Sequence, residues 1–301
     1  MSEPFHQLPE PAALHTLMSR HHPLDWGDPL PTKAELVTAF GPRATGQALG
    51  LLRSAIGRHD QVTADLVAAI QPGDKAHQLD HRVKGPESLA RKFWTASQRK
   101  RPALTDDVLR YTVLATSPDT LVDSTRQTVD RLVDRGWTVD SAHHSYLDGS
   151  RYKGVHVVMR DPTRQQVEVQ FHTPESAEVK ARTTRLYEVE RDPRQPGQRR
   201  SEARAECIRL SAEMATPTGI EQLTELHGVA VAARCYGKQA TSRAERPPAQ
   251  SPTQSAEQSA RQSAGQSAER SAGFSGRSPD PSADRATRRP RGDVQDGRMI
   301  T

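Results

Sequence analysis

The chain has few cysteines, few aromatic residues and no long apolar run. Cys207 and Cys235 are its only cysteines, too few for a disulfide scaffold and without the spacing of a zinc motif. A reducing, cytoplasmic setting is therefore expected. No apolar run approaches the ~18 residues of a membrane helix. The first residues lack the basic start and apolar stretch of a signal peptide, so the sequence predicts no membrane association.

Apolar residues are scarce and unevenly distributed. They make up 34% of the 301 residues and gather between Leu30 and Tyr236, enough chain to bury one core. Residues 1–32 show no clear period, and we expect a loosely ordered lead-in there. Residues 237–301 repeat Gln-Ser-Ala and hold a single aromatic residue. Such a segment buries too little apolar surface to offset its ordering entropy, so the sequence predicts one domain over residues 33–236 and a disordered C-terminal tail.

The formal net charge is +5. A basic balance favours phosphate-rich partners such as nucleotides, RNA or DNA. It is also compatible with a surface that only keeps the protein in solution, so the motifs must decide between the two.

Periodicity predicts helices on both sides of a group of strands. Helical spacing recurs over residues 32–70 with a break at Gly41-Pro42, and another helix opens at Gly85-Pro86. Strand-like runs are expected at 107–115, 137–146, 152–160 and 165–172, with a helix over 118–135 between the first two. Further helices are expected at 174–189, 198–214 and 220–233. This order predicts an α/β or α+β domain, with a small mixed sheet flanked by helices.

The last expected strand is the most informative one. Side chains alternate across a strand, so one face is apolar and the other carries Glu168, Gln170 and His172. Three polar residues in a row indicate either a solvent-facing sheet or the floor of a polar site. On the preceding strand, His156 points the opposite way from Val155 and Val157, and we expect it beside Glu168.

Asp107 begins the first expected strand, at a kind of position where α/β sheets gather ligands. Asp107 and Glu168 suit Mg²⁺, a hard ion usually held by one or two carboxylates together with waters and substrate phosphates. Each acid taken singly also fits an ordinary surface side chain, and Asp106 is an alternative to Asp107.

Basic residues surround the predicted helix start at Gly85-Pro86. Arg82 and Lys84 precede it, and Ser88 and Lys92 lie one turn apart on the same helix face. Free backbone N–H groups and the helix dipole attract phosphate at such an end, although a solvated basic helix fits as well. Tyr152 stands at a strand start, where it could stack on a base or lie half-buried.

In this order, the motifs resemble the synthetase domain of the RelA/SpoT family, which has a nucleotidyltransferase-like fold. Arg82, Lys84, Ser88 and Lys92 are similar to that family's Arg-x-Lys-x-x-x-Ser-x-x-x-Lys motif, which handles ATP phosphates. Asp107 stands at the place of its Mg²⁺-binding aspartate. The resemblance covers roughly residues 45–190.

Two further segments extend the resemblance to the acceptor side. Tyr152 to His156 looks like the family's Tyr-x-Ser-x-His segment, whose tyrosine stacks on the acceptor guanine. Glu168 to Thr173 looks like its Glu-x-Gln-x-Arg-Thr strand, whose glutamate is essential for catalysis. The resemblance therefore implies a catalytic role for Glu168 and Asp107. It also implies nucleotide contacts for a second set of residues: Tyr152, His156, Gln170 and His172.

The chain departs from the family pattern at four positions. Arg110 and Thr112 stand where Gly and Arg are usual, Gly154 where Ser is common, and His172 where Arg is common. We expect these changes near the acceptor nucleotide or the sheet packing rather than at the ATP phosphates. Residues 168–187 look like a divergent branch found in short, stand-alone or toxin-like proteins.

The resemblance implies an ATP-dependent pyrophosphokinase that uses Mg²⁺. Pyrophosphate would pass from ATP to the 3′-hydroxyl of GDP or GTP, giving an alarmone of the stringent response. Two alternatives stay open. One is a toxin that pyrophosphorylates the 3′ end of tRNA, with an antitoxin as candidate partner; the other is a degenerate domain that only binds nucleotide or RNA. The sequence does not indicate an oligomeric state.

Overall fold

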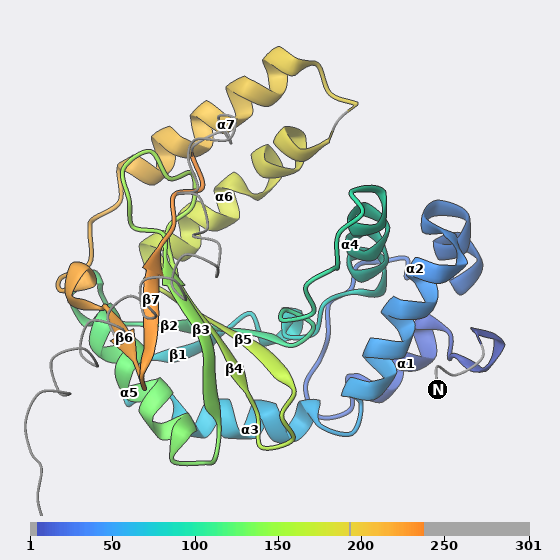
Figure 1. Ribbon diagram of the computed structural model, residues 1–301, viewed down its shortest axis with the longest axis horizontal. Helices are drawn as coiled ribbons and strands as arrows, with labels where there is room; N and C mark the ends of the chain where they lie inside the picture. The colour runs from blue at the N-terminus through green and yellow to red at the C-terminus, as the bar shows by residue number, and fades with distance from the viewer. Residues whose placement is uncertain (1–4, 193, 238–301) are drawn as a thin grey trace, which may run out of the picture. The chain divides into compact units, whose positions relative to one another are not determined.

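A mixed sheet of seven strands lies at the centre of the computed structural model, which describes residues 5–192 and 194–237 (Figure 1). The strand order is β1-β2-β5-β4-β3-β7-β6. The predicted α/β class with helices flanking a mixed sheet is confirmed. The strands are β1 (Lys75–His77), β2 (Arg110–Leu114), β3 (Thr138–His144), β4 (Val155–Arg160), β5 (Gln166–His172), β6 (Glu225–Leu226) and β7 (Val229–Ala233).

The pairing of β2 with β5 matters most for function. These two strands run parallel, whereas β5–β4, β4–β3 and β1–β2 are antiparallel. In this register Arg110 lies opposite Glu168, and Thr112 lies opposite Gln170. The parallel pairing brings the start of β2, where Asp107 precedes the strand, close to Glu168.

The apolar face of the sheet packs against α3 (His59–Ala69) and α5 (Leu121–Val133), both on the same side in Figure 1. The apolar side chains of β5 point there and are fully buried, as the alternation predicts. The Tyr111 hydroxyl lies 2.9 Å from the hydroxyl of Thr63 on α3, which satisfies both buried polar groups. A functional site on the sheet would therefore lie on its polar face.

Two helix pairs stand near the polar face. One is α4 (Pro86–Gln98) packed on α2 (Lys33–Ala55); the other is α6 (Pro174–Arg191) paired with α7 (Gly197–Ala212). The break predicted in α2 is present, since Gly41 has φ 80° inside it. Helix α6 starts directly after β5, where Thr173 and Ser176 form a capping box. The remaining helical elements are η1 (Phe5–Gln7), α1 (Pro11–Met18), η2 (Leu79–His81), η3 (Pro118–Thr120) and η4 (Ile220–Gln222).

The loosely ordered lead-in expected over residues 1–32 is wrong for its described part, residues 5–32. Helix α1 buries Leu14 and Met18 completely, and Leu8 and Leu24 are buried on either side of it. A helix of eight residues shows only about two turns of periodicity. That signal is too short to separate it from a Pro- and His-rich loop.

The helix predicted over residues 220–233 is also wrong beyond its first turn. After η4 the chain forms β6, turns at Gly228 with φ 78°, and returns as β7. Strand β7 pairs in parallel with β3, so the sheet edge supplies a backbone partner that the sequence cannot reveal. The tail predicted from residue 237 lies, from residue 238 on, outside the described residues. Within the described part of the chain, no helix has the length and apolarity needed to cross a membrane.

Candidate active site

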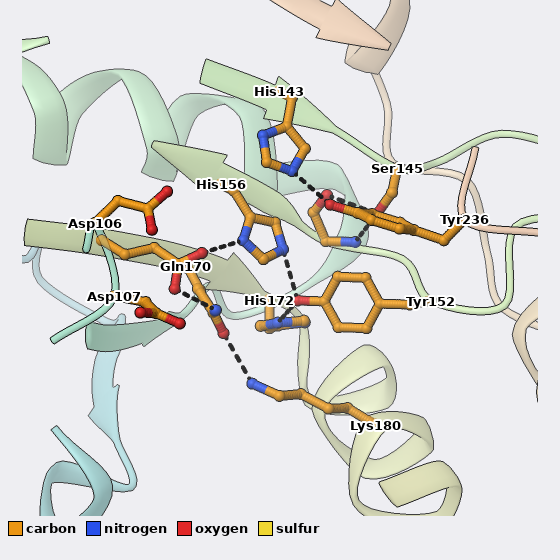
Figure 2. A network of polar contacts seen from close by, with 12 residues as sticks. Asp106, Asp107, His143, Ser145, Tyr152, His156, Gln170, His172, Lys180 and Tyr236 are labelled. Carbon is orange, nitrogen blue, oxygen red and sulfur yellow. Dashed lines mark hydrogen bonds and ion pairs between the residues drawn. The ribbon is translucent and has the colours of Figure 1, made fainter. Parts of the chain in front are cut away.

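Polar side chains from four neighbouring strands share the face of the sheet that α3 and α5 leave uncovered. Figure 2 shows those of three strands close together: His143, His156, Gln170 and His172. The strand pairings place on this face Arg110 and Thr112 of β2, Glu168, Gln170 and His172 of β5, His156 of β4 and His143 of β3. The predicted polar floor is therefore a cluster of interacting groups rather than a solvent-facing surface.

Glu168 is held on both carboxylate oxygens. His156 Nδ1 lies 2.7 Å from Oε1, and Gln170 Nε2 donates to Oε2 at 3.0 Å. Burial raises the pKa of the Glu168 carboxyl, but the hydrogen bond and charge of His156, with the charge of Arg110, outweigh burial and bring the pKa below its usual value. The predicted contact between His156 and Glu168 is confirmed, and the site holds a fixed, ionised carboxylate.

Tyr152 joins two imidazole rings through its hydroxyl. That oxygen lies 2.9 Å from His156 Nε2 and 2.8 Å from His172 Nε2. A carboxylate only accepts, so His156 Nδ1 donates to Glu168. The tyrosine hydroxyl has one proton, so it donates to one imidazole and accepts from the other. A continuous hydrogen-bonded chain thus runs from Glu168 through His156 and Tyr152 to His172 (Figure 2).

His172 ends this chain in the interior. Its ring is fully buried, and Nδ1 contacts the Ser176 hydroxyl at 2.9 Å. Burial holds the pKa of His172 well below its usual value, so the ring is neutral. Both ring nitrogens have partners in the protein, and the contact of His172 with a nucleotide stays a prediction.

A second tyrosine packs beside Tyr152. The His143 ring stacks on His156 with centroids 4.7 Å apart, and its Nε2 lies 2.9 Å from the Tyr236 hydroxyl. The Tyr152 ring meets His156, His172 and Tyr236 at centroid distances of 5.3, 5.5 and 5.9 Å. Tyr152 is thus surrounded on several sides, and its stacking on a base stays a prediction.

Asp107 is the acid nearest the basic residues of α4. Lys92 Nζ lies 2.7 Å from Oδ1, Lys84 Nζ contacts Oδ2, and Asp106 is 3.5 Å from Lys92. A β-bridge between Val83 and Leu109 brings Lys84 to Asp107. Burial raises the pKa of Asp107, but Lys84 and Lys92 outweigh burial and lower the pKa. Asp107 thus contacts the lysines more closely than Asp106 does, which favours Asp107 as the acid of the predicted site.

Ser88 lies half-exposed in the first turn of α4, and its hydroxyl is 3.5 Å from the Arg91 guanidinium. No side chain caps this helix start, so its first N–H groups have no side-chain partner. Two residues of the predicted phosphate motif, Lys84 and Lys92, meet at Asp107, and Ser88 lies one turn before Lys92 on α4.

Arg82, the fourth residue of that motif, is not in the site. Its side chain is fully buried. Its guanidinium donates to the carbonyl oxygens of Met18, His22, Pro23 and Leu79 at 2.8–2.9 Å. The expectation that Arg82 contacts ATP phosphates is therefore wrong. Arg82 instead attaches the N-terminal segment to the strand region, which sequence spacing could not show.

Sequence reasoning missed Lys180, Arg110, His143 and Tyr236. Lys180 Nζ donates to Gln170 Oε1 at 2.9 Å, and Figure 2 shows it reaching up from α6 toward β5. Arg110 was noted only as a departure from a motif. The strand alternation that placed Glu168 would also have placed Arg110 on the polar face once the β2–β5 pairing was known.

The Mg²⁺ ion expected at Asp107 and Glu168 stays a prediction. Both groups offer hard carboxylate oxygens, Glu168 from β5 and Asp107 from the segment before β2, and each oxygen has a partner in the protein that the ion would have to displace or share. Their charges are close enough for Asp107 to affect the pKa of Glu168. Mg²⁺ usually takes one or two such groups and completes its shell with waters and phosphates.

A separate cavity of about 590 Å³ lies between α2 and α4. Phe40, Phe93 and Trp94 line it together with basic residues, but no carboxylate or histidine does. It therefore lacks the groups needed for acid–base or metal chemistry, which the polar face of the sheet possesses.

No protein-family model matches the chain, and no curated protein matches it. Solved structures similar to it include the following two. One is the complex of the Type VI effector Tas1 with its immunity protein, at 20% identity and a TM-score of 0.33 over 57% of this chain and 97% of that chain. The other is a GTP pyrophosphokinase family protein from Streptococcus pneumoniae, at 17% identity and a TM-score of 0.33 over 60% and 87%. At this level of likeness, the chemistry must be argued from the site itself.

Proposed function

We propose that the protein transfers pyrophosphate from ATP to the 3′-hydroxyl of a nucleotide, with GDP or GTP as acceptor. The observation that carries the proposal is that two acids with different partners lie near each other. Asp107 contacts the lysines at the start of α4. Glu168, on β5, is hydrogen-bonded by His156 and Gln170. Phosphoryl-group transfer needs such positioning and charge neutralisation more than a reactive nucleophile.

In the proposed reaction, Lys84, Lys92 and the start of α4 bind the ATP phosphates. A bound Mg²⁺ would neutralise phosphate charge, with Asp107 and Glu168 as its protein ligands. The acceptor 3′-oxygen forms a bond to the β-phosphorus, the bond from that phosphorus to the bridging α–β oxygen breaks, and AMP leaves. Glu168 either orients the hydroxyl or accepts its proton. His156 and Tyr152 keep the carboxylate in place.

Replacing Glu168 by Gln tests this assignment. The amide keeps the size of the side chain but cannot take the proton, so turnover of ATP with GDP should fall by about 10²-fold or more. Products are resolved by chromatography. Glu178→Gln, an exposed position on α6, is the matched control and should leave turnover unchanged. Chelation of Mg²⁺ should abolish the reaction, and added Mg²⁺ should restore it. Equal turnover by Glu168→Gln and the wild type would contradict the assignment.

The 3′ end of tRNA is the second candidate acceptor, favoured by the net charge of +5. The two acceptors are separated by incubating labelled ATP with either GDP or tRNA and following the label. If tRNA is the acceptor and the protein is a toxin, an antitoxin is its expected partner. If neither acceptor is labelled while ATP still binds, the remaining alternative is a domain that only binds nucleotide or RNA.

A further inference from the structure

The polar face lacks positive charge where the sequence pattern leads one to expect it. At position 172 the resembled motif has Arg, and this chain has a histidine. His172 is fully buried, and burial holds its pKa well below the usual value. It therefore contributes no positive charge at neutral pH, and any anion bound on this side must be neutralised by other groups.

Two cations outside the recognised motifs lie on this face. Arg110 is directly opposite Glu168 in the β2–β5 register. Lys180 comes from α6 and donates to the side-chain oxygen of Gln170 at 2.9 Å. The two cations are close enough for Arg110 to lower the pKa of Lys180. They reach the same stretch of β5 from different elements.

Neither cation forms an ion pair within the described part of the chain, although the charge of the Glu168 carboxylate acts on both. Lys180 bonds to a neutral amide, and no side-chain hydrogen bond or ion pair holds Arg110. Burial, followed by the charge of Arg110, lowers the pKa of Lys180 to about 8. Two half-buried cations that share one carboxylate, Glu168, carry more positive charge than that group neutralises, and a bound anion would offset the cost of burying the remainder.

Lys180 also borders a hollow of about 50 Å³. Thr112, His77 and Gln78 line it as well, and their side chains are polar. This hollow lies toward α6. Of the lysines that hold Asp107, Lys92 is on α4 and Lys84 lies just before it, so the two groups of cations come from different parts of the chain and suit two different phosphate groups.

We propose that Arg110 and Lys180 form the subsite for the phosphate carried on the 5′ carbon of the acceptor, replacing the cation absent at position 172. The proposal rests on the proposed function, because it assumes that the acceptor hydroxyl lies at Glu168. The same phosphate chemistry is present in a free nucleotide and in the backbone of an RNA.

The test measures binding without turnover, in the full chain and in the absence of ATP. Calorimetry compares inorganic pyrophosphate, GDP, guanosine and a short single-stranded RNA as probes. Lys180→Met and Arg110→Met should each weaken pyrophosphate and GDP binding about tenfold, as expected for one charged hydrogen bond. Binding of guanosine, which has no phosphate, should not change. Lys180→Arg should restore most of the affinity.

Arg182→Met is the matched control, because Arg182 is exposed on the same helix and the substitution removes the same charge. If Lys180→Met weakens pyrophosphate binding no more than Arg182→Met does, the subsite is wrong. If the variants impair RNA binding but not GDP binding, the phosphate belongs to an RNA backbone. If the subsite is present but ATP is not turned over with any acceptor, the proposed function fails while the subsite stands.

Discussion

At the scale of residues, Gly154 and His172 are adjacent in space and depend on each other, and both differ from the motifs that the sequence resembles. A carbon added as Cβ at Gly154 would lie 2.8 Å from His172 Cε1 and 2.9 Å from the Tyr152 hydroxyl. The serine common at position 154 would therefore collide with the imidazole and tyrosine that interact here. The absence of a side chain at 154 lets the buried histidine bond to Tyr152 and, through it, position His156 and Glu168.

Gly154→Ala should accordingly destabilise the protein by about 1–3 kcal/mol through overpacking. Urea denaturation measures this free energy of unfolding. In Gly154→Ala combined with His172→Ala, the loss should be smaller than the sum of the single losses, because the added methyl then has room. Gly50→Ala is the control, since no heavy atom lies within 4 Å of its added carbon. Additive losses would show that the two positions are independent.

At the scale of elements, Arg82 joins parts of the chain that are distant in sequence. Its guanidinium donates to four carbonyl oxygens: those of Met18 at the end of α1, of His22 and Pro23 between α1 and α2, and of Leu79 in η2. Burial lowers its pKa from the ordinary value, but these carbonyls satisfy most of its donors. Helix α1 thereby stays attached to the strand region, and the adjacent Lys84 is directed to Asp107.

Arg82→Met should lower the free energy of unfolding by about 3 kcal/mol or more, because the carbonyls lose charged donors inside the protein. The denaturant midpoint is the measurement. The Michaelis constant for ATP should stay near the wild-type value in the protein that still folds. Lys92→Met should show the opposite behaviour, with a stability loss of about 1 kcal/mol or less and a raised Michaelis constant. If Arg82→Met instead raised the Michaelis constant for ATP and left the stability unchanged, Arg82 would have to be a ligand of the ATP phosphates.

At the scale of the whole molecule, neutral buried histidines make the free energy of unfolding depend on pH. Burial lowers the pKa of His143 to about 3, and also lowers the pKa values of His144 and His172. The unfolded chain takes up these protons near pH 6.5, whereas the folded protein does not. The unfolded state therefore binds more protons below pH 6.5, and stability must decrease as the pH falls through that range.

We expect the urea midpoint to fall steadily from pH 7 to pH 5. Each such histidine contributes at most about 1.4 kcal/mol per pH unit. His143→Gln should make the decrease less steep, whereas His21→Gln, at an exposed position, should not. An unchanged midpoint between pH 7 and pH 5 would mean that these rings are protonated in the folded protein.

The sequence alone determined the mixed α/β class, the central four strands and the alternation that separates Glu168 from the apolar core, because these follow from local periodicity. It also placed His156 beside Glu168. Only the tertiary structure decided the environments of Arg82 and His172. Arg82 is buried and bonded to carbonyl oxygens, and His172 is buried beside Tyr152. It alone brought Arg110 and Lys180 to one stretch of β5 and added β7 to the sheet. Those outcomes depend on which distant segments become neighbours, and a spacing rule carries no information about burial or partners across the chain.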